Sequence, residues 1–132
     1  MAHKDDAPLS ELLHGSDPLV LLVPGQAPFS IRRAGTFWSR FAGLMGRREG
    51  DWGLWISPCD AIHMMFMRFA LDVVFLDRRG TIVSIRTGVK PWGMAFGGKG
   101  AHSVIELPAS RNLTRGLTPG MRVPLAVAEP SA

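Results

Sequence analysis

Short runs in which apolar and polar residues alternate cover most of this chain, and a period of two is typical of β-strands. In the most apolar stretch, residues 62–85, two strand-like runs flank the turn sequence Asp77–Gly80. The first run, residues 71–76, is apolar on both faces, which predicts a central strand. The return run, residues 82–86, has a wetter face, so we expect it nearer the solvent. Gly80 stands where a tight connection needs positive φ, and the pattern therefore predicts a β-hairpin.

Further strands and one helix follow from the same periodicities. Apolar runs near Pro, Gly or Ser predict strands at residues 18–23, 29–33, 52–56, 103–107 and 121–127. Phe37, Phe41, Leu44 and Met45 recur at the spacing of one helical face, which predicts a short α-helix. Together these elements predict a mainly β chain, a single-domain β-sandwich or barrel of about six to eight short strands plus one short α-helix.

The length and the distribution of polar residues predict the domain organisation. A chain of 132 residues suits a single domain with its own core. Residues 1–17 are mostly polar, with leucines spaced for a turn or two of helix, and we expect a loosely ordered N-terminal arm. We expect the single β-rich domain to cover residues 18–128, followed by a C-terminal tail at residues 129–132.

Residues 91–100 (PWGMAFGGKG) form a segment rich in glycine. Glycine loses the most backbone freedom when it is ordered, so we expect a mobile loop that carries Trp92, Met94 and Phe96. This loop either covers a pocket as a lid or packs on the core. It approaches the phosphate-binding pattern G-x-x-x-x-G-K-[ST], but Gly100 replaces the hydroxyl residue and a strand follows instead of a helix. Both departures argue against nucleotide hydrolysis.

The composition of the chain is typical of a globular protein, and residues 18–132 carry a net positive charge. With 46% hydrophobic and 20% charged residues, the chain is globular rather than disordered. Residues 1–17 carry a net charge of −3 and residues 18–132 a net charge of +7, and 12 of the 15 basic residues are Arg. Arg is suited to paired hydrogen bonds with carboxylate or phosphate, which favours an anionic partner. The Arg residues are scattered, however, so a solvated surface explains them better than a dedicated nucleic-acid face.

Cysteine content and hydropathy bear on location. Cys59 is the sole cysteine and cannot form an internal disulfide, so the fold does not depend on an oxidising compartment. The acidic start does not resemble a secretory signal, and the apolar run Leu19–Val23 is too short to span a bilayer. We therefore expect a soluble, cytoplasmic protein with no membrane partner.

Four polar residues isolated within apolar runs are the main candidates for chemistry: His63, Arg68, Asp72 and Glu106. An ionised side chain in such a run must be paired or lie at a rim. In a structural interpretation, Arg68 pairs with Asp72 or Glu106, and His63 bonds a backbone carbonyl. In a functional interpretation, Arg68 and Arg40 bind a ligand anion at a pocket rim, where His63 donates or accepts a proton. The sequence leaves both interpretations open.

Thiol and metal chemistry have weaker support. On a strand, Cys59 and His63 share a face but lie about 13 Å apart, and a lone cysteine is usually a small buried apolar group. No pair of Asp, Glu, His or Cys residues shows the close, repeated spacing of known metal sites, so we expect neither a metal nor a cofactor.

Several segments resemble the domain of unknown function 192 family. They are residues 40–45 (RFAGLM), Ile62–His63, residues 67–77 (MRFALDVVFLD) and residues 104–107 (VIEL). The resemblance covers roughly residues 31–123, and Arg40, Met67, Asp72 and Glu106 fall on family motif positions. It implies one small β-rich domain, sandwich-like with jelly-roll character, and one short helix. It implies no activity, because the family's name assigns none.

Three functional hypotheses follow from these features. The first, which we favour over catalysis, is a non-catalytic domain that binds a small anionic ligand or a protein partner, as a monomer or weak homodimer. Its predicted site residues are Arg40, His63, Met67, Arg68, Asp72, Glu106, Trp92 and Phe96. The second is a small hydrolase or isomerase that uses His63 with Asp72 or Glu106 as acid and base. The third is a basic module that contacts nucleic acid, although the aromatic residues lie among apolar ones and argue against an open stacking platform.

Overall fold

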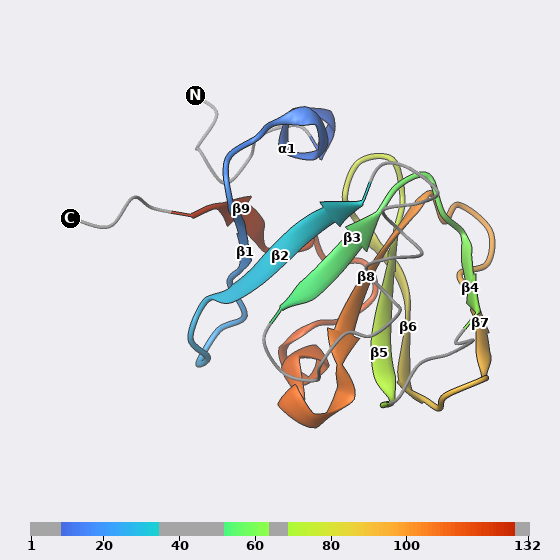
Figure 1. Ribbon diagram of the computed structural model, residues 1–132. Helices are drawn as coiled ribbons and strands as arrows, with labels where there is room; N and C mark the ends of the chain where they lie inside the picture. The colour runs from blue at the N-terminus through green and yellow to red at the C-terminus, as the bar shows by residue number, and fades with distance from the viewer. Residues whose placement is uncertain (1–8, 35–51, 64–68, 129–132) are drawn as a thin grey trace.

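The computed structural model describes residues 9–34, 52–63 and 69–128, and this part of the chain is mainly β, as predicted (Figure 1). Its strands are β1 (Leu19–Leu21), β2 (Phe29–Ala34), β3 (Gly53–Ile56), β4 (Ala61–His63), β5 (Leu71–Leu76), β6 (Ile82–Val89), β7 (Met94–Phe96), β8 (Ser103–Pro108) and β9 (Leu125–Val127). Helix α1 covers Leu9–His14, and two 3₁₀ turns, η2 (Ala109–Arg111) and η3 (Leu113–Gly116), follow β8. The helix predicted around Phe37 to Met45 lies outside the described residues.

Seven of the strands form one sheet in the order β6-β5-β8-β3-β2-β1-β9. Its neighbouring strands run antiparallel except for β2 and β3, which are parallel. The sheet curls until its two ends meet: Thr81 and Arg122 form an isolated bridge, and the Ile82 N–H donates to the Met121 carbonyl over 2.8 Å. The result is a half-barrel with one concave and one convex face (Figure 1).

The predicted hairpin is strands β5 and β6, which pair in antiparallel register. The Asp77 carboxylate closes the turn, because its Oδ1 accepts hydrogen bonds from the N–H groups of Arg79 (2.8 Å) and Thr81 (2.9 Å). Gly80 has φ of 87°, a conformation that favours glycine. Strand β5 lies between β6 and β8 and is buried along its whole length, which confirms the predicted central strand.

The concave face holds the larger core cluster, which includes Trp55, Val74, Leu76, Ile105 and Leu107. Helix α1 belongs to this cluster, because two of its leucines, Leu9 and Leu12, are buried in it. The helix lies within the segment that we expected to be a loosely ordered arm. Removing those side chains from water stabilises the docked helix, which is too short to be stable in isolation.

The convex face carries a second core cluster, which includes Leu54, Ile56, Val73, Phe75 and Val104. A two-stranded ribbon, β4 paired with β7, covers part of this face and contributes the buried side chains of Ile62 and Ala95 (Figure 1). Because the ribbon alternates buried and outward positions, it can seal the core and still present side chains to a ligand.

Strand β7 corrects the expectation of a mobile glycine-rich loop at residues 91–100. Met94–Phe96 pair with Ala61–His63, and the glycines lie at either end of this three-residue strand rather than within it. At Gly97 a Cβ atom would lie 2.6 Å from Cδ1 of Phe75, so the backbone approaches the sheet at a place where only glycine fits. The segment therefore packs on the core through Ala95.

Candidate functional site

The residues predicted to form a site do not all fall in the described part of the chain. Arg40, Met67 and Arg68 lie outside it. His63 is the last residue of β4, where its backbone pairs with Met94. The described candidates are Asp72, Glu106, Trp92 and Phe96, and the structure separates the two acidic residues from the two aromatic ones.

Asp72 lies inside the protein, although the functional interpretation placed it at a pocket rim. Its side chain is 4% exposed, and both carboxylate oxygens accept hydrogen bonds. Oδ1 accepts from the Gly88 N–H (2.8 Å), and Oδ2 accepts from the Thr114 hydroxyl (3.1 Å). Gly88 has φ of 62° at an irregularity in the pairing of β5 with β6. Asp72 therefore joins β5 to a β-bulge in β6 and to the turn η3.

Glu106 lies on the opposite face of the sheet from Asp72. In the register of β8, Glu106 stands opposite Val73 and Leu54, whose side chains belong to the convex cluster, whereas Asp72 stands opposite Leu107 of the concave cluster. Glu106 is fully buried. The two carboxylates cannot share one cavity, so a His63 acid–base site could use at most one of them.

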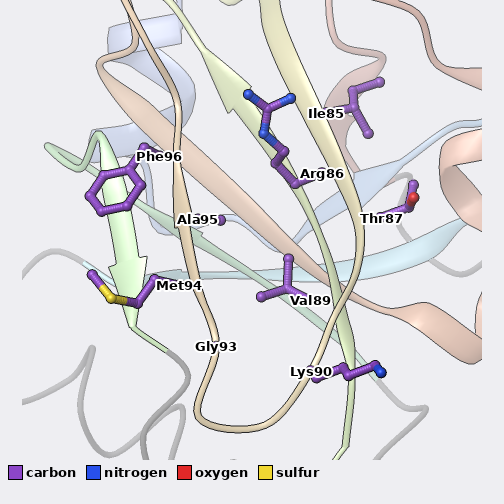
Figure 2. A pocket seen from close by; sticks show the side chains of 9 residues that line it. All are labelled: Ile85, Arg86, Thr87, Val89, Lys90, Gly93, Met94, Ala95 and Phe96. Carbon is purple, nitrogen blue, oxygen red and sulfur yellow. The ribbon is translucent and has the colours of Figure 1, made fainter.

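A groove of about 590 Å³ opens between β6 and β7. Its lining residues are Ile85, Arg86, Thr87, Val89, Lys90, Gly93, Met94, Ala95 and Phe96 (Figure 2). Arg86 and Val89 point from β6 toward β7, and Ala95 points from β7 toward β6, whereas Met94 and Phe96 extend from the other side of β7. Of the predicted site residues, Phe96 alone belongs to this lining.

Three large apolar side chains are exposed on the segment that forms one wall of the groove. Trp92 is 64% exposed, Met94 51% and Phe96 58%. Exposed apolar residues gathered in this way mark a binding surface more often than scattered single ones do. We expected all three on one loop, either a lid or a core-packing loop. The structure places Met94 and Phe96 as exposed residues of the paired ribbon and Trp92 in the turn before it.

The segment that carries these side chains is held at both ends. At its start the Gly93 N–H donates to the Lys90 carbonyl over 2.9 Å. At its end the Gly97 N–H donates to the Asp60 carbonyl, and the Ser84 hydroxyl donates to the Gly97 carbonyl, each over 2.8 Å. Trp92 has φ of 68°, a left-handed conformation that costs a non-glycine residue about 1–2 kcal/mol. The anchored ends keep Trp92 in that conformation.

Two basic residues give the groove its charge. Arg86 and Lys90 belong to the lining, and no Asp or Glu of the described residues does. Arg86 is the register partner of Val73, which places it on the convex face next to the ribbon. Sequence analysis did not select Arg86, Lys90 or Met94. The available signal was that Arg86, in the return strand of the hairpin, and Lys90, just after it, precede the exposed aromatic residues in the sequence.

Other chemistries find no assembled site in the described part of the chain. The Cys59 thiol donates to the Ala61 carbonyl over 3.0 Å, as a partly buried structural cysteine would. Among residues 9–34, 52–63 and 69–128, no group of three or more His, Cys, Asp or Glu side chains is arranged to hold a metal ion. In the same ranges, no helix is long and apolar enough to cross a membrane.

Two solved structures share this fold. A putative transcription regulator from Sinorhizobium meliloti superposes with a TM-score of 0.67 at 23% identity, over 84% of this chain and 92% of that one. A protein of unknown function from Novosphingobium aromaticivorans superposes with a TM-score of 0.65 at 19% identity, over 98% of this chain and 99% of its own. At these identities the likeness shows the fold and carries no function.

Sequence relatives show the family. A UPF0127 protein from Thermococcus sibiricus is 34% identical to this chain. The match covers 59% of this chain and 54% of that relative's length. A UPF0127 protein from Pyrococcus furiosus is 32% identical over 59% of this chain and 71% of its own length. The family model DUF192, described as an uncharacterised ACR, matches residues 20–125. The resemblance seen in the sequence is confirmed, and the chain belongs to the DUF192 family.

Proposed function

We propose that this chain is a non-catalytic binding domain that holds a small anionic ligand with an apolar part in the β6–β7 groove. One observation carries the proposal: exposed Met94 and Phe96 of the ribbon line one groove with Arg86 and Lys90, and exposed Trp92 lies in the turn that precedes the ribbon. A ligand that covers the apolar side chains gains roughly 25 cal/mol per Å² of apolar surface removed from water. Its charged group gains an attraction to the two cations that a neutral ligand lacks.

The edge of the sheet at the groove is better suited to a small molecule than to an added β-strand. Strand β6 is the last strand of the seven-stranded sheet, and a terminal strand is a template for pairing with another chain. Here, however, the bulge at Gly88 and the cations Arg86 and Lys90 interrupt that edge. Bulges and charged residues are the features by which proteins block strand addition.

Decanoate is a suitable probe, because it joins a carboxylate to an apolar chain, and decanol is its neutral counterpart. We expect decanoate to raise the melting temperature of the full chain saturably and decanol to raise it much less. Phe96→Ala and the double variant Arg86→Gln with Lys90→Gln should each weaken decanoate binding by about tenfold, as measured by calorimetry. Arg78→Gln, an exposed change at the hairpin turn, is the matched control and should bind normally.

The proposal fails if neither probe produces a saturable shift, or if Arg78→Gln weakens binding as much as the groove variants do. The nucleic-acid hypothesis predicts a different result. A short duplex would then bind with an affinity that falls steeply as salt rises, and Phe96→Ala would have little effect on it.

A further inference from the structure

A second hollow lies between helix α1 and the ends of β2 and β3, and it shares no lining residue with the β6–β7 groove. Its volume is about 370 Å³, and its lining residues are Leu13, His14, Arg33, Ser57, Pro58 and His102. We call it the basic hollow, because its titratable lining residues are one arginine and two histidines. A smaller hollow of about 240 Å³ adjoins it through the shared residues Pro58 and His102.

The guanidinium of Arg33 is fixed in place by the backbone around helix α1. Its Nε–H donates to the Leu12 carbonyl, and Nη1 donates to the Asp17 carbonyl over 2.7 Å. A guanidinium carries five N–H bonds in a planar fork, so three remain beyond these two contacts. An arginine held in this way loses little side-chain freedom when it binds an anion, which favours binding.

Partial burial of Arg33 favours the binding of an anion. The side chain is half-buried, and desolvation lowers the pKa of its guanidinium, while the nearby charge of Asp17 opposes that effect. The attraction between a partly desolvated cation and an anionic ligand is stronger than that between an exposed cation and the same ligand, because less water screens it. Among the described residues, Asp17 lies beside Arg33, and Asp60 lines the adjoining hollow.

The opposite wall adds donors on a rigid part of the fold. His102 is fixed through its backbone, because its N–H donates to the Leu76 carbonyl and its carbonyl accepts from the Cys59 N–H. Ser57 is 7% exposed and supplies a hydroxyl that can donate or accept. His14, at the end of α1, stands beside Arg33 in the lining. Each imidazole supplies at least one ring nitrogen that can donate a hydrogen bond.

We propose that the basic hollow binds a phosphate group, either as free phosphate or as the head of a phosphomonoester. The three remaining Arg33 N–H bonds, two imidazoles and the Ser57 hydroxyl supply more donors than the two oxygens of a carboxylate can accept. A phosphate presents three or four acceptor oxygens and a second negative charge, and it matches the arginine fork in paired geometry. The adjoining hollow has room for the organic part of a phosphomonoester.

Titration of the full chain with inorganic phosphate tests this site. The imidazole NMR signals of His14 and His102 should shift saturably, and chloride at matched ionic strength should not shift them. His102→Ala combined with Ser57→Ala should weaken phosphate binding by about tenfold, because the charged ligand loses two donor groups. Arg78→Gln, an exposed change at the hairpin turn that lines neither hollow, should leave the affinity unchanged.

Shifts that do not saturate, or an equal loss in Arg78→Gln, would overturn the proposal, because either result would show a general response to charge. Phenyl phosphate distinguishes the two sources of the phosphate group. Binding tighter than that of inorganic phosphate indicates a phosphomonoester, and equal binding indicates free phosphate. Neither arm depends on the β6–β7 groove, so this site and the proposed function succeed or fail separately.

Discussion

Asp72 illustrates what the sequence does and does not reveal at the scale of single residues. An ionisable residue inside an apolar strand needs partners, and that rule singled out Asp72 and Glu106, both of which are buried. The partners of Asp72 are a backbone N–H at Gly88 and the hydroxyl of Thr114, which lies 42 positions away in the chain. No local pattern identifies such partners. The faces of the two carboxylates follow from the strand register, in which a shift of one residue moves a side chain to the other face.

Asp72→Ala should lower the free energy of unfolding by about 2–3 kcal/mol, because it leaves the Gly88 N–H and the Thr114 hydroxyl without their acceptor. Thr114→Val removes one of those bonds and should cost about 1 kcal/mol. Urea unfolding of both variants measures the difference. If Asp72→Ala is as stable as the wild type but no longer binds decanoate, Asp72 acts in ligand binding and the structural role assigned above is wrong.

At the scale of elements, the period-two pattern predicted most strands because each buries one face against a core. The β5–β6 hairpin was the clearest case, since the residues of its turn and the apolar pattern of its strands both predicted a hairpin. Strand β7 was missed, because its glycine-rich flanks outweighed three residues of strand. Its stability comes from pairing with β4 and from the buried Ala95, and both are tertiary effects.

Gly97→Ala tests how the β4–β7 ribbon is seated on the sheet. The added methyl group would lie 2.5 Å from the Ala101 Cβ and 2.6 Å from Cδ1 of Phe75, so the ribbon must shift. Overpacking of this kind should cost about 1–3 kcal/mol of stability, measured by urea unfolding. Ala101→Gly removes the closest contact and should recover part of the loss when the two changes are combined. If the changes in the free energy of unfolding of the two single variants simply add in the double variant, the methyl group at position 97 does not contact Ala101 and the ribbon packs loosely on the sheet.

At the scale of the whole molecule, the chain confirms the predicted mainly β fold and the predicted family, but the closure of the sheet is a property of distant contacts. Residues 120–123 bond to Gly80 and Ile82, and this joins the two ends of the sheet. Such non-local pairing leaves no periodic signal in the sequence. The jelly-roll character implied by the resemblance remains a prediction.

The candidate site also depends on contacts between distant parts of the chain, which the sequence does not reveal. The sequence selected Trp92 and Phe96 because large aromatic residues in a glycine-rich segment need a reason to be there. It did not select Arg86 and Lys90, because isolated cations near a turn are usually solvated. Arg86, Lys90 and Phe96 come to line one groove only when the ribbon packs across the convex face beside the end of β6.

The measurement that tests the central claim most directly is a ¹⁵N–¹H NMR titration of the full chain with decanoate. The account predicts saturable changes in the backbone amide signals of residues 85–96, with signals from the far edge at β1 and β9 unchanged. Changes that do not saturate, or that centre on Arg33 and His102 instead, would contradict a ligand site between β6 and β7.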